Sequence, residues 1–160
     1  MATAPEGSLA TLHERPVELL QNLLRFDTTN PPGNEAACIG YIDDVLTDAG
    51  FETTILARDE ARANLVTRLA GQGQAPPLLM YGHVDVVTTE KQDWTYPPFE
   101  GTLADGYVWG RGTLDMKGAV VMMMAALMRA KAQDLAPPGD VVLAVVSDEE
   151  AGGEYGARYL

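Results

Sequence analysis

Two residues with the chemistry of a metal site follow a short apolar stretch in the middle of the chain. His83 and Asp85 stand two positions apart in the segment GHVD, and in an extended backbone this spacing places both side chains on the same side. A histidine that binds a metal through one ring nitrogen usually donates its other N–H to a carboxylate. Asp85 can orient His83 in this way, although a His-x-Asp pair taken alone is equally a local hydrogen-bonded pair.

A second acidic cluster follows the apolar run VVLAVV, where Asp148, Glu149 and Glu150 precede a glycine pair. Adjacent carboxylates at the end of a buried strand repel one another unless a positive charge lies nearby, and a metal ion would supply that charge. One carboxylate can then bind the cation while the other takes a proton from the water that the cation acidifies. By itself the cluster is also compatible with a solvated loop. Asp115, in the segment TLDMKG, is by itself compatible with a helix cap.

The elements that must position these residues are predicted from periodicity and turn residues. Pro16 begins an expected amphipathic helix, Asn34 is the expected cap of a second helix that Gly50 ends, and residues 116–133 have the composition of a long buried helix. Strands are predicted at 51–57, 64–70, 78–81, 107–110 and 141–146, and the final segment GEYGARYL resembles the start of another helix.

Strands separated by helices predict an α/β fold, here a three-layer sandwich with a mainly parallel central sheet. In such folds sites lie beyond the carboxyl ends of the strands. The segments GHVD, TLDMKG and SDEE all stand where one element passes into the next. We therefore expect the three segments to meet in one cleft.

Composition bounds the function classes. The chain has 160 residues, is 46% hydrophobic and carries a net charge of −12, which predicts a globular core and no affinity for nucleic acid or anionic membranes. The single cysteine, Cys38, allows no internal disulfide and is expected to be a small core residue. No signal peptide is visible, and no apolar run reaches the roughly 20 residues that a membrane-spanning helix needs. A cytoplasmic location is predicted.

Several rival chemistries lack their motifs. No Gly-Lys pair exists for a phosphate-binding P-loop, and GRGTLD lacks the third glycine of a dinucleotide loop. Val17 stands where H-E-x-x-H would need its second histidine, and no G-x-S-x-G elbow occurs. No organic cofactor site is therefore predicted.

The segments GHVDVV, WGRGTLDMKG and SDEEAGG, in this order and separation, resemble the signature of the dinuclear zinc deacylases and exopeptidases. That family includes acetylornithine deacetylase, succinyl-diaminopimelate desuccinylase, glutamate carboxypeptidase and the aminoacylases. The segments TTNPPGNE and WTYPPFEG are similar to the same family, so the resemblance runs from about residue 17 to the end.

The resemblance implies two Zn²⁺ ions, for which Co²⁺ or Mn²⁺ can substitute. It assigns His83 and Glu150 as ligands of one ion each and Asp115 as the bridging ligand, with Glu149 as general base and Asp85 as the acid that holds His83. It also implies a cis peptide between Asp115 and Met116. The expected reaction is hydrolysis of an amide in an N-acyl amino acid or a small peptide.

The resemblance further implies that residues 1–160 form the N-terminal portion of a catalytic metallohydrolase domain. The inserted dimerisation or lid domain, the C-terminal part of the fold and the remaining metal ligands would then be absent, and the full-length form would be a homodimer. Two alternatives stay open: a fragment that binds metal weakly without catalysis, and a nucleotide-binding α/β module built on the acidic strand. Zinc uptake would exclude the second alternative, and turnover of N-acyl amino acids would exclude the first.

Overall fold

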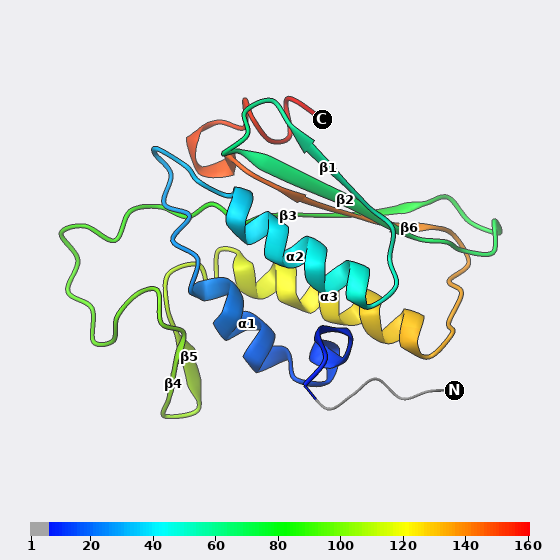
Figure 1. Cartoon of the computed structure of the whole chain (residues 1–160), viewed down its shortest axis with the longest axis horizontal. Coiled ribbons are helices and arrows are strands. Elements are labelled where there is room, and N and C mark those ends of the chain that lie inside the picture. The colour runs from blue at the N-terminus through cyan, green and yellow to red at the C-terminus, as the bar shows by residue number, and fades with distance from the viewer. Residues whose placement is uncertain (1–6) are drawn as a thin grey trace.

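A four-stranded sheet with helices on one face forms the body of the computed structural model (Figure 1), which describes residues 7–160. Part of the N-terminal segment searched for a signal peptide, residues 1–6, lies outside the described residues. The helical elements are η1 (Leu9–Glu14), α1 (Pro16–Leu24), α2 (Ala36–Asp48), α3 (Lys117–Ala132) and η2 (Glu149–Ala151). The strands are β1 (Thr53–Ala57), β2 (Ala63–Leu69), β3 (Leu78–His83), β4 (Thr102–Ala104), β5 (Tyr107–Trp109) and β6 (Val141–Val146). The α/β class is confirmed.

The central sheet is mixed, in the order β1-β2-β6-β3, and not mainly parallel as predicted. Only β3 and β6 run parallel, whereas β1 with β2 and β2 with β6 are antiparallel. The reason lies in the connections. The short turn after β1 can only return as a hairpin, while the long segment that contains α3 allows the parallel crossover between β3 and β6.

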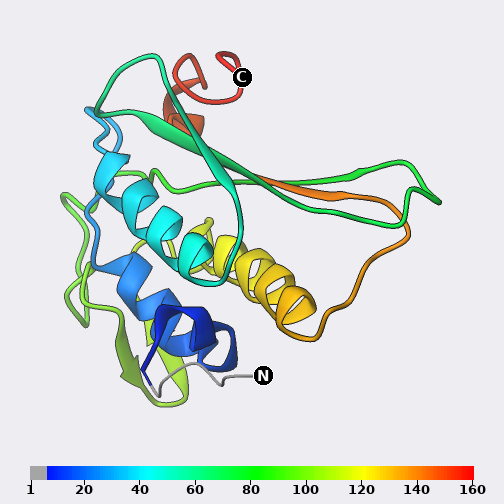
Figure 2. The same cartoon turned by 45° about the vertical axis from the view of Figure 1, so that its right-hand side comes forward.

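Helices cover only one face of this sheet in the described residues (Figures 1 and 2), so the expected three layers are two. The helix-covered face holds the core, where Leu65 and Val145 of the sheet pack with buried residues of α2 and α3. The opposite face leaves Leu79 62% and Tyr81 40% exposed. The apolar residues of the strands therefore have helix partners on one side only.

Four local predictions differ from the structure. Asn34 does not cap α2, which begins after Glu35 without a side-chain cap. Strand β3 continues through His83, and the hairpin strand β4 was not predicted. The segment GEYGARYL forms successive turns instead of a helix, because Gly153 adopts a positive φ of 78° and its carbonyl accepts hydrogen bonds from both Gly156 and Arg158.

Among residues 7–160, no helix combines the length and the apolar character that crossing a membrane requires.

Candidate active site

The parallel pairing of β3 and β6 brings two distant segments of the sequence together. His83 is the register partner of Val146, so the histidine at the end of β3 lies beside the start of the SDEE turn at the end of β6. Asp115, just before α3, also approaches this point, with its Oδ1 3.2 Å from His83 Nε2. The three segments therefore meet at the carboxyl ends of the parallel strands, where the fold class predicts a site.

His83 is buried, and its ring is held by Asp85. The Nδ1 atom lies 3.0 Å from the backbone oxygen of Asp85 and 3.2 Å from its Oδ1. Both neighbours are acceptors, so Nδ1 carries a proton and donates it. In the neutral imidazole the lone pair then stands on Nε2, which faces Asp115 and Glu149. This tautomer is the one that can bind a metal on the open side of the site.

Asp85 is fully buried and accepts hydrogen bonds from several groups besides His83. Its two carboxylate oxygens accept the backbone N–H groups of Glu149 and Glu150 at 3.1 and 3.0 Å. The Asn30 amide donates to the same carboxylate at 2.8 Å. Asp85 therefore fixes both the histidine ring and the backbone that carries the two glutamates.

The donor atoms of His83, Glu149 and Glu150 all lie within 4.8 Å of one another. Glu149 Oε2 lies 3.7 Å from His83 Nε2. Asp115 is 76% exposed at its side chain and is in contact with His83, but it is not part of this group of three. The structure thus gathers four of the predicted residues around the histidine ring, with both glutamates near it.

These donors fit a zinc-type ion. Imidazole nitrogen and carboxylate oxygen bind Zn²⁺ at about 2.0–2.2 Å, so donors on one tetrahedral ion stand about 3.3 Å apart. The separations from His83 Nε2 to Asp115 Oδ1 and to Glu149 Oε2 are 3.2 and 3.7 Å. The spacing of His83 Nε2 and Asp115 Oδ1 therefore fits two ligands of one ion.

The electrostatics of the site are set by burial and by crowded carboxylates. Burial lowers the pKa of His83, but the hydrogen bond and negative charge of Asp85 outweigh it and raise that pKa to about 9. For the acid Asp85, burial acts in the opposite direction and raises the pKa, but hydrogen bonds from His83 and Asn30 outweigh it and hold the pKa of Asp85 below its usual value. The pKa of Glu150 is raised by burial and by the nearby Asp115, Asp85 and Glu149. A cation at this point would relieve this repulsion.

Asp148, the first of the three consecutive acids, points away from the donor group. Its Oδ1 accepts hydrogen bonds from Arg62 at 2.8 Å and Asn30 at 3.1 Å, and its Oδ2 accepts the Tyr155 N–H. Arg62 also binds both carboxylate oxygens of Glu35. The three acids after β6 therefore have different surroundings. Asp148 belongs to a buried ion-pair network, whereas Glu149 and Glu150 reach the donor group.

Sequence reasoning missed this network. Arg62 stands in a polar segment between two predicted strands, and no spacing rule links it to Glu35 or Asp148. Asn30 lies in TTNPPGNE, a segment that resembles the zinc-enzyme family, so this resemblance was the one available signal. The bond between Asp115 and Met116 is cis, as the resemblance implies.

Lys117, the residue after Met116, is another buried charge that sequence reasoning missed. Its ammonium group donates to the backbone oxygens of Leu23 and Phe26 at 3.1 and 2.7 Å, and burial lowers its pKa. It ties the start of α3 to the carboxyl end of α1, and thereby helps fix the loop that carries Asp115.

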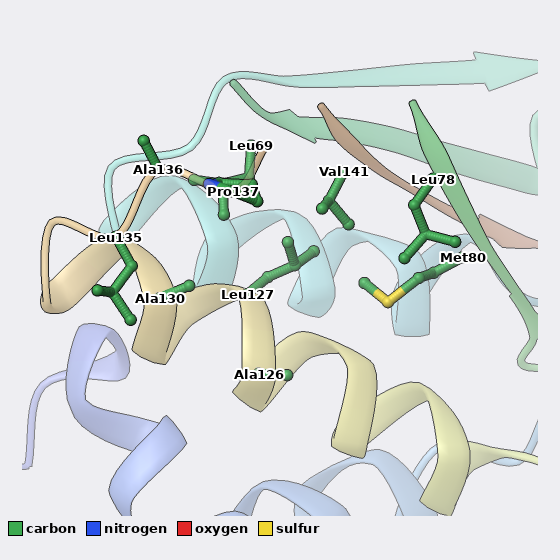
Figure 3. Close-up of a pocket in the computed structure, with 10 residues that line it drawn as sticks. All are labelled: Leu69, Leu78, Met80, Ala126, Leu127, Ala130, Leu135, Ala136, Pro137 and Val141. Atoms are coloured by element: carbon green, nitrogen blue, oxygen red, sulfur yellow. The ribbon is translucent and has the colours of Figure 1, made fainter. Parts of the chain in front are cut away.

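Two of the cavities lined by residues 7–160 are relevant to the site. An apolar one of about 390 Å³ opens between α3, β3 and the segment before β6 (Figure 3), and its lining includes Leu78 at the start of β3, the opposite end of this strand from His83. Leu78, Met80 and Leu127 line it, with no titratable side chain. A second of about 560 Å³ is lined by Trp94, Trp109 and other residues and reaches Asp115. Of these two, the second adjoins the candidate site.

Comparison with known proteins agrees with this geometry. The model of peptidase family M20/M25/M40 matches residues 79–160, the part that holds every candidate site residue. Succinyl-diaminopimelate desuccinylase of Paracoccus denitrificans is 39% identical over 146 residues, which cover 91% of this chain and 37% of that protein. The chain thus spans little more than a third of the length of this curated relative.

Solved structures share the fold at lower identity. The M20 metallo-carboxypeptidase Sso-CP2 of Sulfolobus solfataricus is 18% identical with a TM-score of 0.77, over 88% of this chain and 32% of that one. The Bacillus subtilis YXEP protein, a dinuclear metal-binding peptidase, is 19% identical with a TM-score of 0.62, over 92% and 38%. The gathering of His83, Asp115 and the two glutamates, together with the matched family model, leads to one conclusion: the chain belongs to peptidase family M20/M25/M40.

Proposed function

We propose that this chain is the metal-binding part of a dinuclear zinc hydrolase that cleaves the amide bond of an N-acyl amino acid or a small peptide. The observation that carries the proposal is the cluster of His83, Glu149 and Glu150 donors within 4.8 Å, with Asp115 in contact with the same ring. The 39% identity to a desuccinylase favours an N-acyl amino acid with a free carboxylate as substrate.

In this proposal, His83 and Glu150 would each hold one metal, and Asp115 would be a ligand of both. Bound metals would supply Lewis acidity toward the scissile carbonyl and would lower the pKa of a water. Glu149 would take a proton from that water as its oxygen adds to the carbonyl carbon, and would donate the proton to the leaving nitrogen as the C–N bond breaks, a role that its half-exposed carboxylate suits. Asp85 holds the His83 tautomer that leaves Nε2 free for the metal.

Residues 1–160 would then form the N-terminal portion of a catalytic domain, and further ligands would come from elsewhere in a longer protein or from a partner chain. A homodimer is part of the same proposal. The two alternatives, weak metal binding without catalysis and nucleotide binding, have less support. The matched family model and the donor cluster do not favour a nucleotide site.

The test uses the product of the complete reading frame. We expect zinc-dependent hydrolysis of N-succinyl or N-acetyl amino acids that a chelator abolishes. Glu149→Gln should keep Zn²⁺ and lower turnover roughly 100- to 10,000-fold, because an amide holds its position but cannot accept a proton. Glu150→Gln, the matched neighbour, should lose Zn²⁺ as well. Equal loss of Zn²⁺ in both variants would mean that the two roles are assigned wrongly, and uptake of magnesium nucleotide without zinc would refute the proposal.

A further inference from the structure

The buried charges behind the acidic turn form one connected network. Arg62 is 7% exposed and its guanidinium contacts four acceptor atoms on three residues: both oxygens of Glu35, Oδ1 of Asp148 and the backbone oxygen of Pro32. Glu35 and Asp148 are 0% and 3% exposed. A guanidinium presents its donors in a rigid plane, so these contacts fix the position of Asp148 relative to β2 and α2.

The backbone at Asp148 needs such support. Its φ is +65°, a left-handed conformation that costs energy for a residue with a side chain. Every oxygen of its carboxylate is used: Oδ1 by Arg62 and Asn30, and Oδ2 by the N–H of Tyr155. This conformation sets the direction in which the chain leaves β6, and therefore where the next two side chains point.

Asn30 joins this network to the donor cluster. Its single Nδ2 donates to Asp148 Oδ1 at 3.1 Å and to Asp85 Oδ2 at 2.8 Å. Asp85 in turn holds the His83 ring and the N–H groups of Glu149 and Glu150. The same buried hydrogen-bond network therefore holds both His83 at the end of β3 and the two glutamates after β6.

Burying so many charges is a poor route to stability alone, because the desolvation of each ion offsets most of the attraction between them. A network with this cost is better explained by what it positions. On the basis of the function proposed above, we propose that Arg62, with Glu35 and Asn30, is a positioning residue for the metal site, which acts through the left-handed backbone at Asp148 to aim Glu149 and Glu150 at the ions.

The test measures metal binding directly, in the product of the complete reading frame with Zn²⁺ or Co²⁺ alone. Arg62→Lys keeps the positive charge, but its single ammonium nitrogen cannot replace the planar guanidinium, whose three nitrogens bind Glu35, Asp148 and Pro32. We expect its affinity for Zn²⁺ to fall roughly 10- to 100-fold and the visible absorption of bound Co²⁺ to change, which reports altered ligand geometry. Val45→Ala, a buried truncation on α2 outside the network, is the control: it should lower the melting temperature and leave both metal readouts unchanged.

A second pair of variants covers the case in which Arg62→Lys does not fold. Asparagine tolerates the left-handed region and keeps one acceptor oxygen, whereas alanine has neither property. Asp148→Asn should therefore retain more Zn²⁺ affinity than Asp148→Ala. Wild-type Zn²⁺ affinity and Co²⁺ spectra in Arg62→Lys or Asp148→Ala would overturn the inference and leave the proposed function standing. Failure of the wild-type protein to take up Zn²⁺ would overturn both.

Discussion

Asp85 illustrates how one buried carboxylate can serve two strands. It lies two residues after His83 in sequence, yet it accepts the N–H groups of Glu149 and Glu150, which follow a different strand. Its contact with the histidine is compatible with the His-x-Asp spacing and was implied by the family resemblance. Its role toward the glutamates was not, because that depends on the register of β3 against β6.

Asp85→Ala should therefore weaken metal binding more than the loss of one histidine contact suggests. We expect a roughly 10- to 100-fold loss of Zn²⁺ affinity in the product of the complete reading frame, measured by competition with a chelator. Asp44→Ala, which alters an exposed acid on α2, is the matched control and should have no effect. Unchanged affinity and turnover in Asp85→Ala would mean that Asp85 is only a loop acid.

The candidate ligands were predicted because each stands in a short motif next to a strand or helix. The structure brings these residues together, and their roles as ligands stay a prediction. The network behind them was not predicted, for a physical reason. Arg62 and Asp148 are 86 positions apart, and their pairing follows only from the antiparallel pairing of β2 and β6. A sequence read without its sheet order contains no signal for such a contact.

At the scale of elements, the turn after β6 depends on close backbone packing. A Cβ at Gly156 would lie 1.9 Å from the backbone oxygen of Ser147, whereas a Cβ at Gly40, inside α2, would meet nothing within 4 Å. A side chain is therefore excluded by packing at Gly156 and is sterically allowed at Gly40. Gly156 is required by the packing of the final turns against the end of β6, and Gly40 only costs helix propensity.

Gly156→Ala should destabilise the protein by roughly 1–3 kcal/mol, since the final turns must move off Ser147. Gly40→Ala should stabilise it by about 0.5–1 kcal/mol, because alanine is the better helix former at an uncrowded position. Denaturant unfolding of both variants measures the two changes. An equal effect of the two substitutions would contradict the packing of the final turns.

The start of α1 and the extents of α3 and β6 were predicted almost to the residue, because proline suits a first helical turn and both other elements have a continuous apolar composition. The sheet order was not, since periodicity identifies a strand but not its partner. The final turns were mistaken for a helix because GEYGARYL has helix-compatible side chains, while the positive φ at Gly153 leads the backbone elsewhere.

At the scale of the molecule, the face of the sheet opposite the helices is open and apolar. Leu79 and Tyr81 of the edge strand β3 are exposed on it, beside the partly buried Val142. Exposed apolar residues on a strand with unpaired hydrogen-bonding groups promote association.

The 160-residue chain by itself should therefore self-associate in a concentration-dependent manner. Leu79→Lys should reduce that association, because an edge lysine opposes strand pairing. Arg129→Lys, a charge-conserving change on α3, is the control. Light scattering across a concentration series measures the difference, and a wild-type chain that stays monomeric at high concentration would contradict the expectation.

The same 160-residue chain should bind Zn²⁺ only weakly and show negligible hydrolysis of N-acyl amino acids. In the proposed assignment, Asp115 and one terminal ligand, His83 or Glu150, are available to each metal, whereas zinc sites normally use three or more protein ligands. The other histidine, His13, is engaged within η1, where its Nδ1 lies 3.0 Å from the backbone oxygen of Ala10. Titration with Zn²⁺ against a chelator and an assay with N-succinyl amino acids test the two expectations. A monomer that melts cooperatively, holds two zinc ions tightly and turns over such a substrate would show that the residues described above complete the site unaided.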